Sequence, residues 1–236
     1  VSPLRKFWFF LFPDFSDDDP AVKQVAGMLI LLSILSYMSL QMWRAMFNNY
    51  AVEIAGIDAA QMGAIQSVRE VPGFLALLVI FVLLLIREQY LAYISLALMG
   101  IGLAITGLVS SFMGLLLVTF IMSTGFHYFE TLNQSLTLQH IPKSGAPQFL
   151  GLVRSWSSLA GILGLLAVYF LAEWLPYRAV FALSGGLVLL GVTYSLIHFP
   201  VFHPKVRQHR KMVFRKKYWL FYALTFLAGA RGQIFV

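Results

Sequence analysis

The sequence predicts an all-α protein that crosses a membrane with six helices and the beginning of a seventh. Hydrophobic residues make up 59% of the chain and charged residues only 11%, whereas soluble domains carry about 25% charged residues. Apolar runs of about 20 residues, the length of a membrane-spanning helix, recur along the chain. Together these observations predict a polytopic membrane helix bundle. The chain has no cysteine, which excludes disulfides and thiolate metal sites.

Residues 1–24 are expected to form a cytoplasmic or interfacial segment and not a signal peptide. Their apolar run, FWFFLF, is short, and no small-residue cleavage site follows it. Aromatic side chains in such a run can dip into the headgroup region of a membrane. Asp19 and Pro20 then suit the N-cap and the first position of a spanning helix.

Six spans are expected to form a transmembrane bundle over residues 25–199. The predicted spans are Val25–Phe47, Met62–Ile86, Leu91–Val109, Phe112–Gln139, Phe149–Leu171 and Ala179–Phe199. Prolines separate the later spans, as residues that break helices do. A basic cytoplasmic loop is expected at residues 200–217. Residues 218–236 are expected to be the start of a seventh helix, in a second bundle that continues past Val236.

The distribution of lysine and arginine predicts a cytoplasmic N-terminus. With that orientation, 13 of the 17 lysines and arginines fall in inner segments, and Arg178 alone falls in an outer loop. The inner residues are Arg5, Lys6, Lys23, Arg87, Lys143, Arg154, Lys205, Arg207, Arg210, Lys211, Arg215, Lys216 and Lys217. Cytoplasmic loops of membrane proteins carry such an excess. We therefore expect a plasma-membrane or bacterial inner-membrane protein whose basic loop touches anionic lipid and not nucleic acid.

Polar residues follow one face of two predicted spans. A polar group in hydrocarbon is costly unless it has a partner, so such a face is expected to line a cavity or another helix. In the first span the polar residues recur every three or four positions, at Ser33, Tyr37, Gln41, Arg44 and Asn48. In the fourth span they are Ser123, His127, Glu130, Gln134 and Thr137. The third and sixth spans carry few polar residues and are expected to face lipid or to pack through small residues.

This pattern resembles the N-terminal half of a transporter of the major facilitator superfamily, followed by the start of the second half. The spans with a polar face and the spans with few polar residues occur in the same order over spans one to three and four to six, as an inverted repeat would give. The resemblance implies that helices one, four and seven line a central cavity and that the basic loop joins two halves. Two family motifs are not matched. Arg87 and Glu88 stand where the family has a glycine–aspartate–arginine–glycine loop, and GLVRSWSSLAGILG lacks the proline of drug antiporters.

Glu130 and His127 are the strongest candidates for a functional site. Glu130 lies nine residues before Gln139, so about 14 Å from the inner edge, and His127 lies one turn further in. Solute and ion sites of transporters lie near this depth. The two residues are i, i+3 neighbours that could share a hydrogen bond and relay a proton, because imidazole titrates near neutral pH. Alternatively, both side chains hold neighbouring helices together, or they bind a metal ion with help from weaker amide ligands.

Three arginines in the predicted spans favour an anionic solute, because guanidinium groups pair with carboxylate or phosphate. Arg69 and Glu70 lie toward the outer end of the second span, beside a Pro72–Gly73 pair that can kink it. As neighbours about 100° apart on a helix, they need not pair with each other. Arg44 either binds solute or extends toward the headgroups. Arg231 lies about 20 Å into the seventh helix, where it either binds the solute or pairs with an acid such as Glu70.

Aromatic and glycine residues have simpler expected roles. Candidates for aromatic walls of a cavity are Tyr37, Trp43 and Tyr128. Residues expected at the outer membrane interface are Trp43, Tyr50, Trp174 and Tyr177. Glycines expected at close helix contacts are Gly161, Gly164, Gly185 and Gly186.

The sequence therefore predicts a secondary active transporter that moves a small, anionic organic solute by alternating access, with protons as the coupling ion. The expected solute-binding or coupling residues are Glu130, His127, Gln134, Arg231, Arg69, Glu70, Arg44, Gln41 and Tyr37. We expect no cofactor, because no phosphate-binding loop is present. We also expect no enzyme, because the polar residues follow stripes and do not cluster. The alternatives are a non-transporting membrane scaffold or assembly factor, and a metal-ion transporter that uses His127 and Glu130.

Overall fold

The computed structural model describes residues 20–202, 216–220 and 223–224. The chain divides into two units, residues 1–206 and 207–236. In the second unit the described part includes a short 3-10 turn at Lys216–Tyr218 (η3). The predicted interfacial segment with Asp19, most of the basic loop, Arg231 and most of the predicted seventh helix lie outside the described residues. All that follows concerns the first unit.

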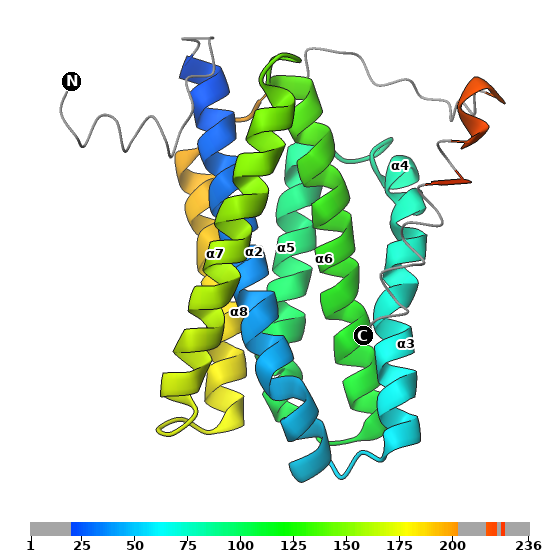
Figure 1. The fold of residues 1–236 in the computed structure, drawn as a ribbon, viewed down its shortest axis with the longest axis vertical. Helices are drawn as coiled ribbons and strands as arrows, with labels where there is room; N and C mark the ends of the chain where they lie inside the picture. Colours follow the sequence, from blue (N-terminus) through cyan, green and yellow to red (C-terminus); the bar gives the residue numbers. More distant parts are fainter. Residues whose placement is uncertain (1–19, 203–215, 221–222, 225–236) are drawn as a thin grey trace. The chain divides into compact units, whose positions relative to one another are not determined.

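Six helical spans make up the described part of the first unit, and each overlaps the span predicted at its place (Figure 1). They are α2 (Pro20–Glu53), α3 (Ala59–Leu75) continued by η1 (Ala76–Leu78) and α4 (Val79–Val82), α5 (Glu88–Ile105) continued by η2 (Thr106–Leu108), α6 (Phe112–His140), α7 (Ala146–Leu171) and α8 (Tyr177–His198). All six are long and apolar enough to cross a membrane. The described residues contain no strand. The predicted all-α membrane helix bundle is confirmed.

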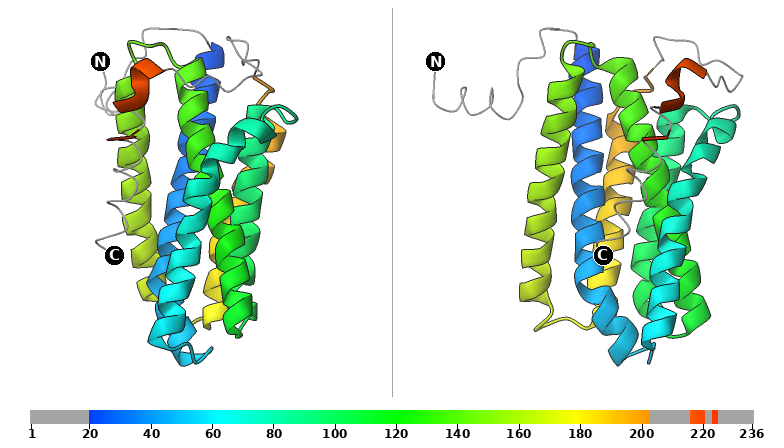
Figure 2. Two further views of the ribbon diagram at one scale, coloured as in Figure 1. Left: turned by 90° about the vertical axis from the view of Figure 1, so that its right-hand side faces the viewer. Right: turned by 45° about the vertical axis from the view of Figure 1, so that its right-hand side comes forward.

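The helices pack as neighbours that are often distant in the sequence. α2 contacts α7 and α8, α5 contacts α6 and α8, and α3 contacts α6. Figure 2 shows from two sides how α3 runs along α6. This arrangement brings α2, α3, α6 and α7 together around the polar residues described below.

Short polar sequences start two of the helices. The Asp58 carboxylate accepts a hydrogen bond from the Gln61 backbone N–H (2.8 Å), and the Gln61 side chain accepts one from the Asp58 N–H (3.2 Å). This capping box satisfies two backbone donors that the first turn of α3 leaves unpaired. Ser111 satisfies one such donor at the start of α6, where its hydroxyl accepts from the Gly114 N–H at 3.2 Å.

The second span is not a continuous α-helix. Pro72 lies inside α3, and the helix changes to the 3-10 turn η1 directly after Leu75. Proline removes a backbone donor and crowds the preceding turn, which weakens an α-helix at that point. Two hydroxyl groups of α6 support the irregular stretch, since Ser123 donates to the Arg69 carbonyl and Tyr128 donates to the Leu75 carbonyl at 3.3 Å. The predicted break at Pro72–Gly73 therefore occurs a few residues further along.

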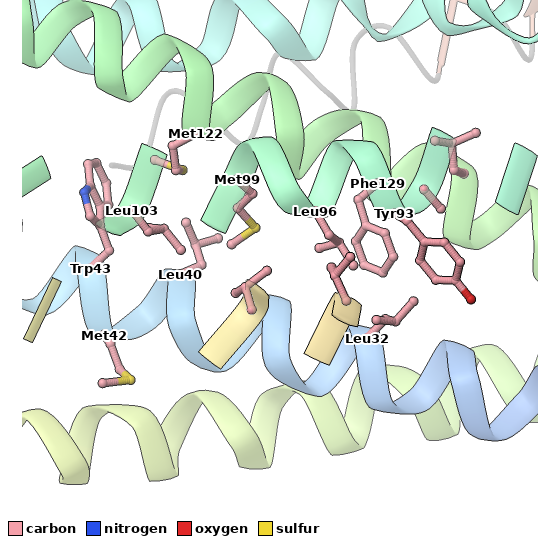
Figure 3. Packing of buried hydrophobic residues seen from close by; sticks show 14 of the residues in the cluster. Leu32, Leu40, Met42, Trp43, Tyr93, Leu96, Met99, Leu103, Met122 and Phe129 are labelled. Atoms are coloured by element: carbon pink, nitrogen blue, oxygen red, sulfur yellow. The ribbon is translucent and has the colours of Figure 1, made fainter. Parts of the chain in front are cut away.

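The apolar core lies where α2 meets α5 and α6. Figure 3 shows the α2 residues Leu32, Leu40 and Trp43 facing Tyr93, Leu96, Met99 and Leu103 of α5, with Met122 and Phe129 of α6 behind them. All of these side chains are buried.

Two of the aromatic residues expected at the outer interface are buried among the helices. Trp43 is only 1% exposed, and its indole N–H donates to the Thr106 hydroxyl at 3.2 Å. Tyr50 is also buried, and its hydroxyl donates to the Val109 carbonyl at 3.0 Å. Trp174, by contrast, is 82% exposed. Trp43 and Tyr50 thus face other helices and not lipid, because helical length gives depth in the membrane but not the direction in which a side chain points.

Replacing Trp43 with phenylalanine is expected to lower the free energy of unfolding by about 1 kcal/mol, because one buried hydrogen bond is lost. The loss stays limited because Thr106 keeps its own hydrogen bond to the Gly102 carbonyl (2.8 Å). Thermal unfolding of the purified protein in detergent measures the change. Trp174→Phe is the matched control and should leave the melting temperature unchanged. Equal effects of the two substitutions would contradict the buried role of Trp43.

Glycines let several helices approach closely. A Cβ atom built on Gly164 of α7 would lie 2.8 Å from the Met38 carbonyl of α2, and one on Gly161 would lie 3.1 Å from the Gln41 side chain. A Cβ atom on Gly185 of α8 would lie 2.2 Å from the Gly100 carbonyl of α5. These three glycines are at close contacts, as predicted. Gly186 is not, since nothing lies within 4 Å of a Cβ atom built there. The third and sixth spans thus pack on each other through small residues.

Candidate solute and proton site

A tyrosine, a glutamate and an arginine from three helices form the first polar group of the site. The Tyr37 hydroxyl on α2 donates a hydrogen bond to Glu130 Oε1 on α6 at 2.6 Å. The same hydroxyl accepts a hydrogen bond from Arg154 Nη1 on α7 at 2.7 Å. Arg154 Nη1 also lies 3.6 Å from Glu130 Oε1. The three side chains therefore form one hydrogen-bonded, charged group that ties α2, α6 and α7 together.

This group remains open on one side. The Glu130 side chain is 46% exposed and the Arg154 side chain 69% exposed. The Arg154 guanidinium lies against the Tyr37 ring, with Cζ 5.4 Å from the ring centroid. A cation over an aromatic face is held in place without the use of its hydrogen-bond donors. The group is therefore both ordered and accessible.

Arg154 is the residue that sequence reasoning missed. We expected it in an inner segment, but it lies in α7, eight residues after Ala146 and so about 12 Å into the helix. The apolar run of the fifth span hides it, because one arginine changes the mean hydropathy of a long window little. A signal was present, since Ser157 and Ser158 follow Arg154 at helical spacing in the same span.

An arginine, a glutamate and a histidine form the second polar group, between α3 and α6. Arg69 donates two hydrogen bonds to Glu70 Oε1, from Nε at 2.9 Å and from Nη2 at 2.8 Å. His127 Nε2 lies 3.9 Å from Glu70 Oε2, near enough for an ion pair when the imidazole is protonated. The neighbouring Arg69 and Glu70 side chains thus do pair with each other.

The second group corrects the expected partner of His127. No hydrogen bond or ion pair between His127 and Glu130 occurs among the described residues, although they are i, i+3 neighbours. Glu130 turns toward α2 and α7, whereas His127 turns toward α3. The His127 ring also packs against Gly73, where a built Cβ atom would lie 3.3 Å from His127 Cε1. His127 and Glu130 therefore serve two separate contacts.

Arg44 lies between the two groups. It interacts electrostatically with Arg69 and Glu70 on one side and with Tyr37 and Glu130 on the other. Its side chain is exposed, and no hydrogen bond or ion pair joins it to another residue in the described part of the chain. His127 likewise interacts electrostatically with both glutamates. The two groups are thus parts of one charged network on α2, α3, α6 and α7.

The other polar residues predicted on α2 and α6 differ in their exposure. Gln134 is exposed, and Gln41 lies against Gly161 of α7. Ser123 and Thr137 share the face of Glu130 by spacing, yet both are buried among helices. Asn133 lies next to this face and donates a hydrogen bond to Ser33 at 3.0 Å. The predicted polar face of α6 is therefore exposed near Glu130 and buried at its two ends, Ser123 and Thr137.

The metal alternative finds no support in the described residues. They contain no group of three or more histidine, cysteine, aspartate or glutamate side chains that could hold a metal ion. The network instead combines three guanidinium groups with two carboxylates, which leaves one positive charge in excess. Such a balance suits an anion that pairs with a guanidinium.

Comparison with known protein families gives one match that covers most of the chain. A family model described as Major Facilitator Superfamily matches residues 29–236. The chain belongs to the Major Facilitator Superfamily. Together with the six spans, membership makes it an integral membrane protein of a transporter family. Comparison with curated proteins gives no match.

Proposed function

We propose that this superfamily member is a secondary active transporter that moves a small, anionic organic solute together with protons by alternating access. The observation that carries the proposal is the open Tyr37–Glu130–Arg154 group inside the spans, with Arg44 beside it. Ionisable side chains at this depth are costly and mark solute and ion pathways in membrane proteins. α2 and α6 are the first and fourth spans, whose equivalents are expected to line the central cavity.

The charge balance supports an anionic solute. Arg44 and Arg154 are both exposed, and Arg44 has no hydrogen-bond partner among the described residues. A guanidinium offers five N–H donors in a planar fork that matches a carboxylate or phosphate. A neutral solute would leave these donors and the excess positive charge without a partner.

Two titratable residues of α6, His127 and Glu130, support coupling to protons. Glu130 can take up a proton inside a span, where the change in its charge alters its pairing with Arg154. His127 carries an imidazole, the side chain whose unperturbed pKa lies nearest to neutral pH, and it lies beside Glu70. A transporter needs such groups, whose charge differs between the loaded and the empty states, if solute and proton are to move together.

The broken second span supports alternating access. Gly73 packs against His127, and the hydroxyls of Ser123 and Tyr128 donate to the carbonyls of Arg69 and Leu75 in the last turns before the break. Hinges of moving elements are a few residues that absorb a change in backbone dihedrals. We propose that α4 and η1 move relative to α3 during the transport cycle. We also propose that the protein lies in a plasma membrane or a bacterial inner membrane with its N-terminus in the cytoplasm.

The test is uptake by the full chain reconstituted into liposomes under an imposed pH gradient. A panel of labelled carboxylates, sulfonates and phosphates serves as the set of candidate solutes, with neutral sugars as the control class. We expect an anion to accumulate only when the gradient is present. Movement of sugars alone would contradict the anionic solute, and anion movement without a gradient would contradict proton coupling. No movement of any solute would favour a scaffold role.

A further inference from the structure

We infer that Gln89 anchors the connection between the two units of the chain, because it binds the backbone that follows α8 to the start of α5. This inference goes beyond the proposed function, since it depends neither on the solute nor on protons. It concerns the end of the bundle at which α2 and α5 begin and α6 and α8 end.

The side-chain amide of Gln89 binds the backbone on both sides of Val201. Its Oε1 accepts a hydrogen bond from the Phe202 N–H at 2.9 Å, and its Nε2 donates to the Pro200 carbonyl at 3.0 Å. The Val201 N–H, between these two groups, makes no hydrogen bond to a described residue, and its side chain is exposed. One side chain therefore supplies the partners of a backbone donor and a backbone acceptor that lie two residues apart.

The surrounding helices fix the orientation of this amide. Gln89 is only 5% exposed, and its Nε2 also donates to the Tyr93 hydroxyl, one turn further along α5, at 3.0 Å. The Tyr93 hydroxyl in turn donates to Met28 Sδ on α2 at 2.9 Å. If the amide were reversed, its N–H groups would face the Phe202 N–H and its oxygen would face the Pro200 carbonyl. Only one orientation therefore satisfies both backbone groups.

Two phenylalanines hold the same segment at its ends. The Phe202 ring lies 5.9 Å, between centroids, from the ring of His140, the last residue of α6. At the other end, a Cβ atom built on Gly27 of α2 would lie 4.0 Å from Phe199 Cε1. Both phenylalanines pack against the apolar core. The backbone after α8 therefore lies along α2, α5 and α6, and Gln89 supplies its hydrogen bonds.

This segment is the beginning of the connection to the second unit. α8 ends at His198, and the first unit ends at residue 206, four positions after Phe202. A displacement of the connection is therefore passed to α5 through Gln89, as well as to α8 through the backbone. Gln89 is thus a positioning residue, which fixes the place where the connection leaves the six spans.

The experiment measures hydrogen exchange of single backbone amides in the purified full chain in lipid nanodiscs, by mass spectrometry with fragmentation that resolves individual residues. In the wild type, after correction for intrinsic rates, the Phe202 amide should exchange about tenfold or more slowly than the Val201 amide, because only Phe202 donates a hydrogen bond. This comparison needs no substitution, so it tests the inference even if a variant does not fold.

Two substitutions at Gln89 test the anchor directly. Gln89→Leu keeps the approximate size of the side chain but removes both partners of the segment, so the Phe202 amide should exchange about tenfold or more faster than in the wild type. Gln89→Glu keeps an acceptor for the Phe202 N–H but loses the donor to the Pro200 carbonyl, and it should give an intermediate rate. Amides in the middle of α5 should keep their wild-type rates in both variants.

Tyr93→Phe is the matched control. It removes one hydrogen bond of the same buried amide but leaves both bonds between Gln89 and the connection. The Phe202 amide should therefore stay within about threefold of its wild-type rate, the range of a small change in local stability.

Three outcomes would overturn the inference. They are equal exchange of the Val201 and Phe202 amides in the wild type, a Phe202 amide that stays protected in Gln89→Leu, and faster exchange along the whole of α5 in that variant. The last result would assign Gln89 to the stability of α5 and not to the connection. None of these outcomes bears on uptake into liposomes, so the proposed function and this inference fail independently.

Discussion

Uptake driven by a pH gradient is expected to fall at least about tenfold when Glu130 is replaced by glutamine. Glutamine keeps the size of the side chain and an oxygen that accepts the hydrogen bond from Tyr37, which lies 2.6 Å from Glu130 Oε1 in the native protein. It removes the only atoms of Glu130 that can bind and release a proton. A tenfold loss corresponds to about 1.4 kcal/mol of coupling free energy. The measurement is initial uptake into liposomes with and without the gradient.

Exchange of labelled for unlabelled solute across the same liposomes should survive in Glu130→Gln. During exchange the transporter changes between its outward-facing and inward-facing states with solute bound each time, so no net movement of protons occurs. Exchange therefore needs the binding site but not the titration of Glu130. Loss of gradient-driven uptake with retained exchange would therefore assign Glu130 to coupling. Loss of both activities in a folded protein would instead assign it to solute binding alone. Unchanged gradient-driven uptake would contradict the proton role of Glu130.

Glu173→Gln is the matched control for the charge itself. Glu173 is an exposed glutamate in the connection between α7 and α8, and its substitution removes the same charge away from the network. It should leave uptake and exchange at wild-type values. A loss in Glu173→Gln similar to that in Glu130→Gln would indicate an effect of net charge on the reconstituted protein.

The spans could be predicted from the sequence because their cause is local. A bilayer of fixed thickness requires a run of about 20 apolar residues, and polar turns and prolines separate these runs. The break in the second span has a local cause too, since Pro72 removes a backbone donor. These features depend on residues within one helix, so one sequence is sufficient to locate them.

The pairing of the polar residues could not be predicted, because it depends on how the helices pack. Tyr37 and Glu130 are 93 positions apart, and Tyr37 and Arg154 are 117 positions apart. Spacing along α6 places His127 and Glu130 on one face and suggests that they pair. The structure instead gives them different partners, because α3 lies on one side of this face and α2 and α7 lie on the other.

The burial of Trp43 could not be predicted either, because it too depends on how the helices pack. Its sequence position near the end of the first span suits an interfacial residue. The structure extends α2 to Glu53, so Trp43 lies well inside the helix and faces α5. The length of a helix beyond its apolar run is set by packing and capping, which hydropathy does not report.

Replacing Gly185 with alanine is expected to destabilise the bundle by about 1–3 kcal/mol, the range for overpacking in a closely packed interior. A Cβ atom at this position would lie 2.2 Å from the Gly100 carbonyl oxygen and 2.5 Å from the Ala104 backbone nitrogen. Both are backbone atoms, so no side chain can rotate to make room. α5 and α8 would have to separate, and the dispersion contacts that hold membrane helices together would weaken. Thermal unfolding in detergent measures the shift.

Gly186→Ala is the matched control one residue along the same helix. Nothing lies within 4 Å of a Cβ atom built on Gly186, so alanine fits without displacement. Alanine favours a helix over glycine by up to about 1 kcal/mol, so this substitution should leave the melting temperature unchanged or raise it. The same added methyl group should thus lower the melting temperature at position 185 but not at position 186. A melting temperature that Gly185→Ala leaves unchanged or raises would contradict the close α5–α8 contact.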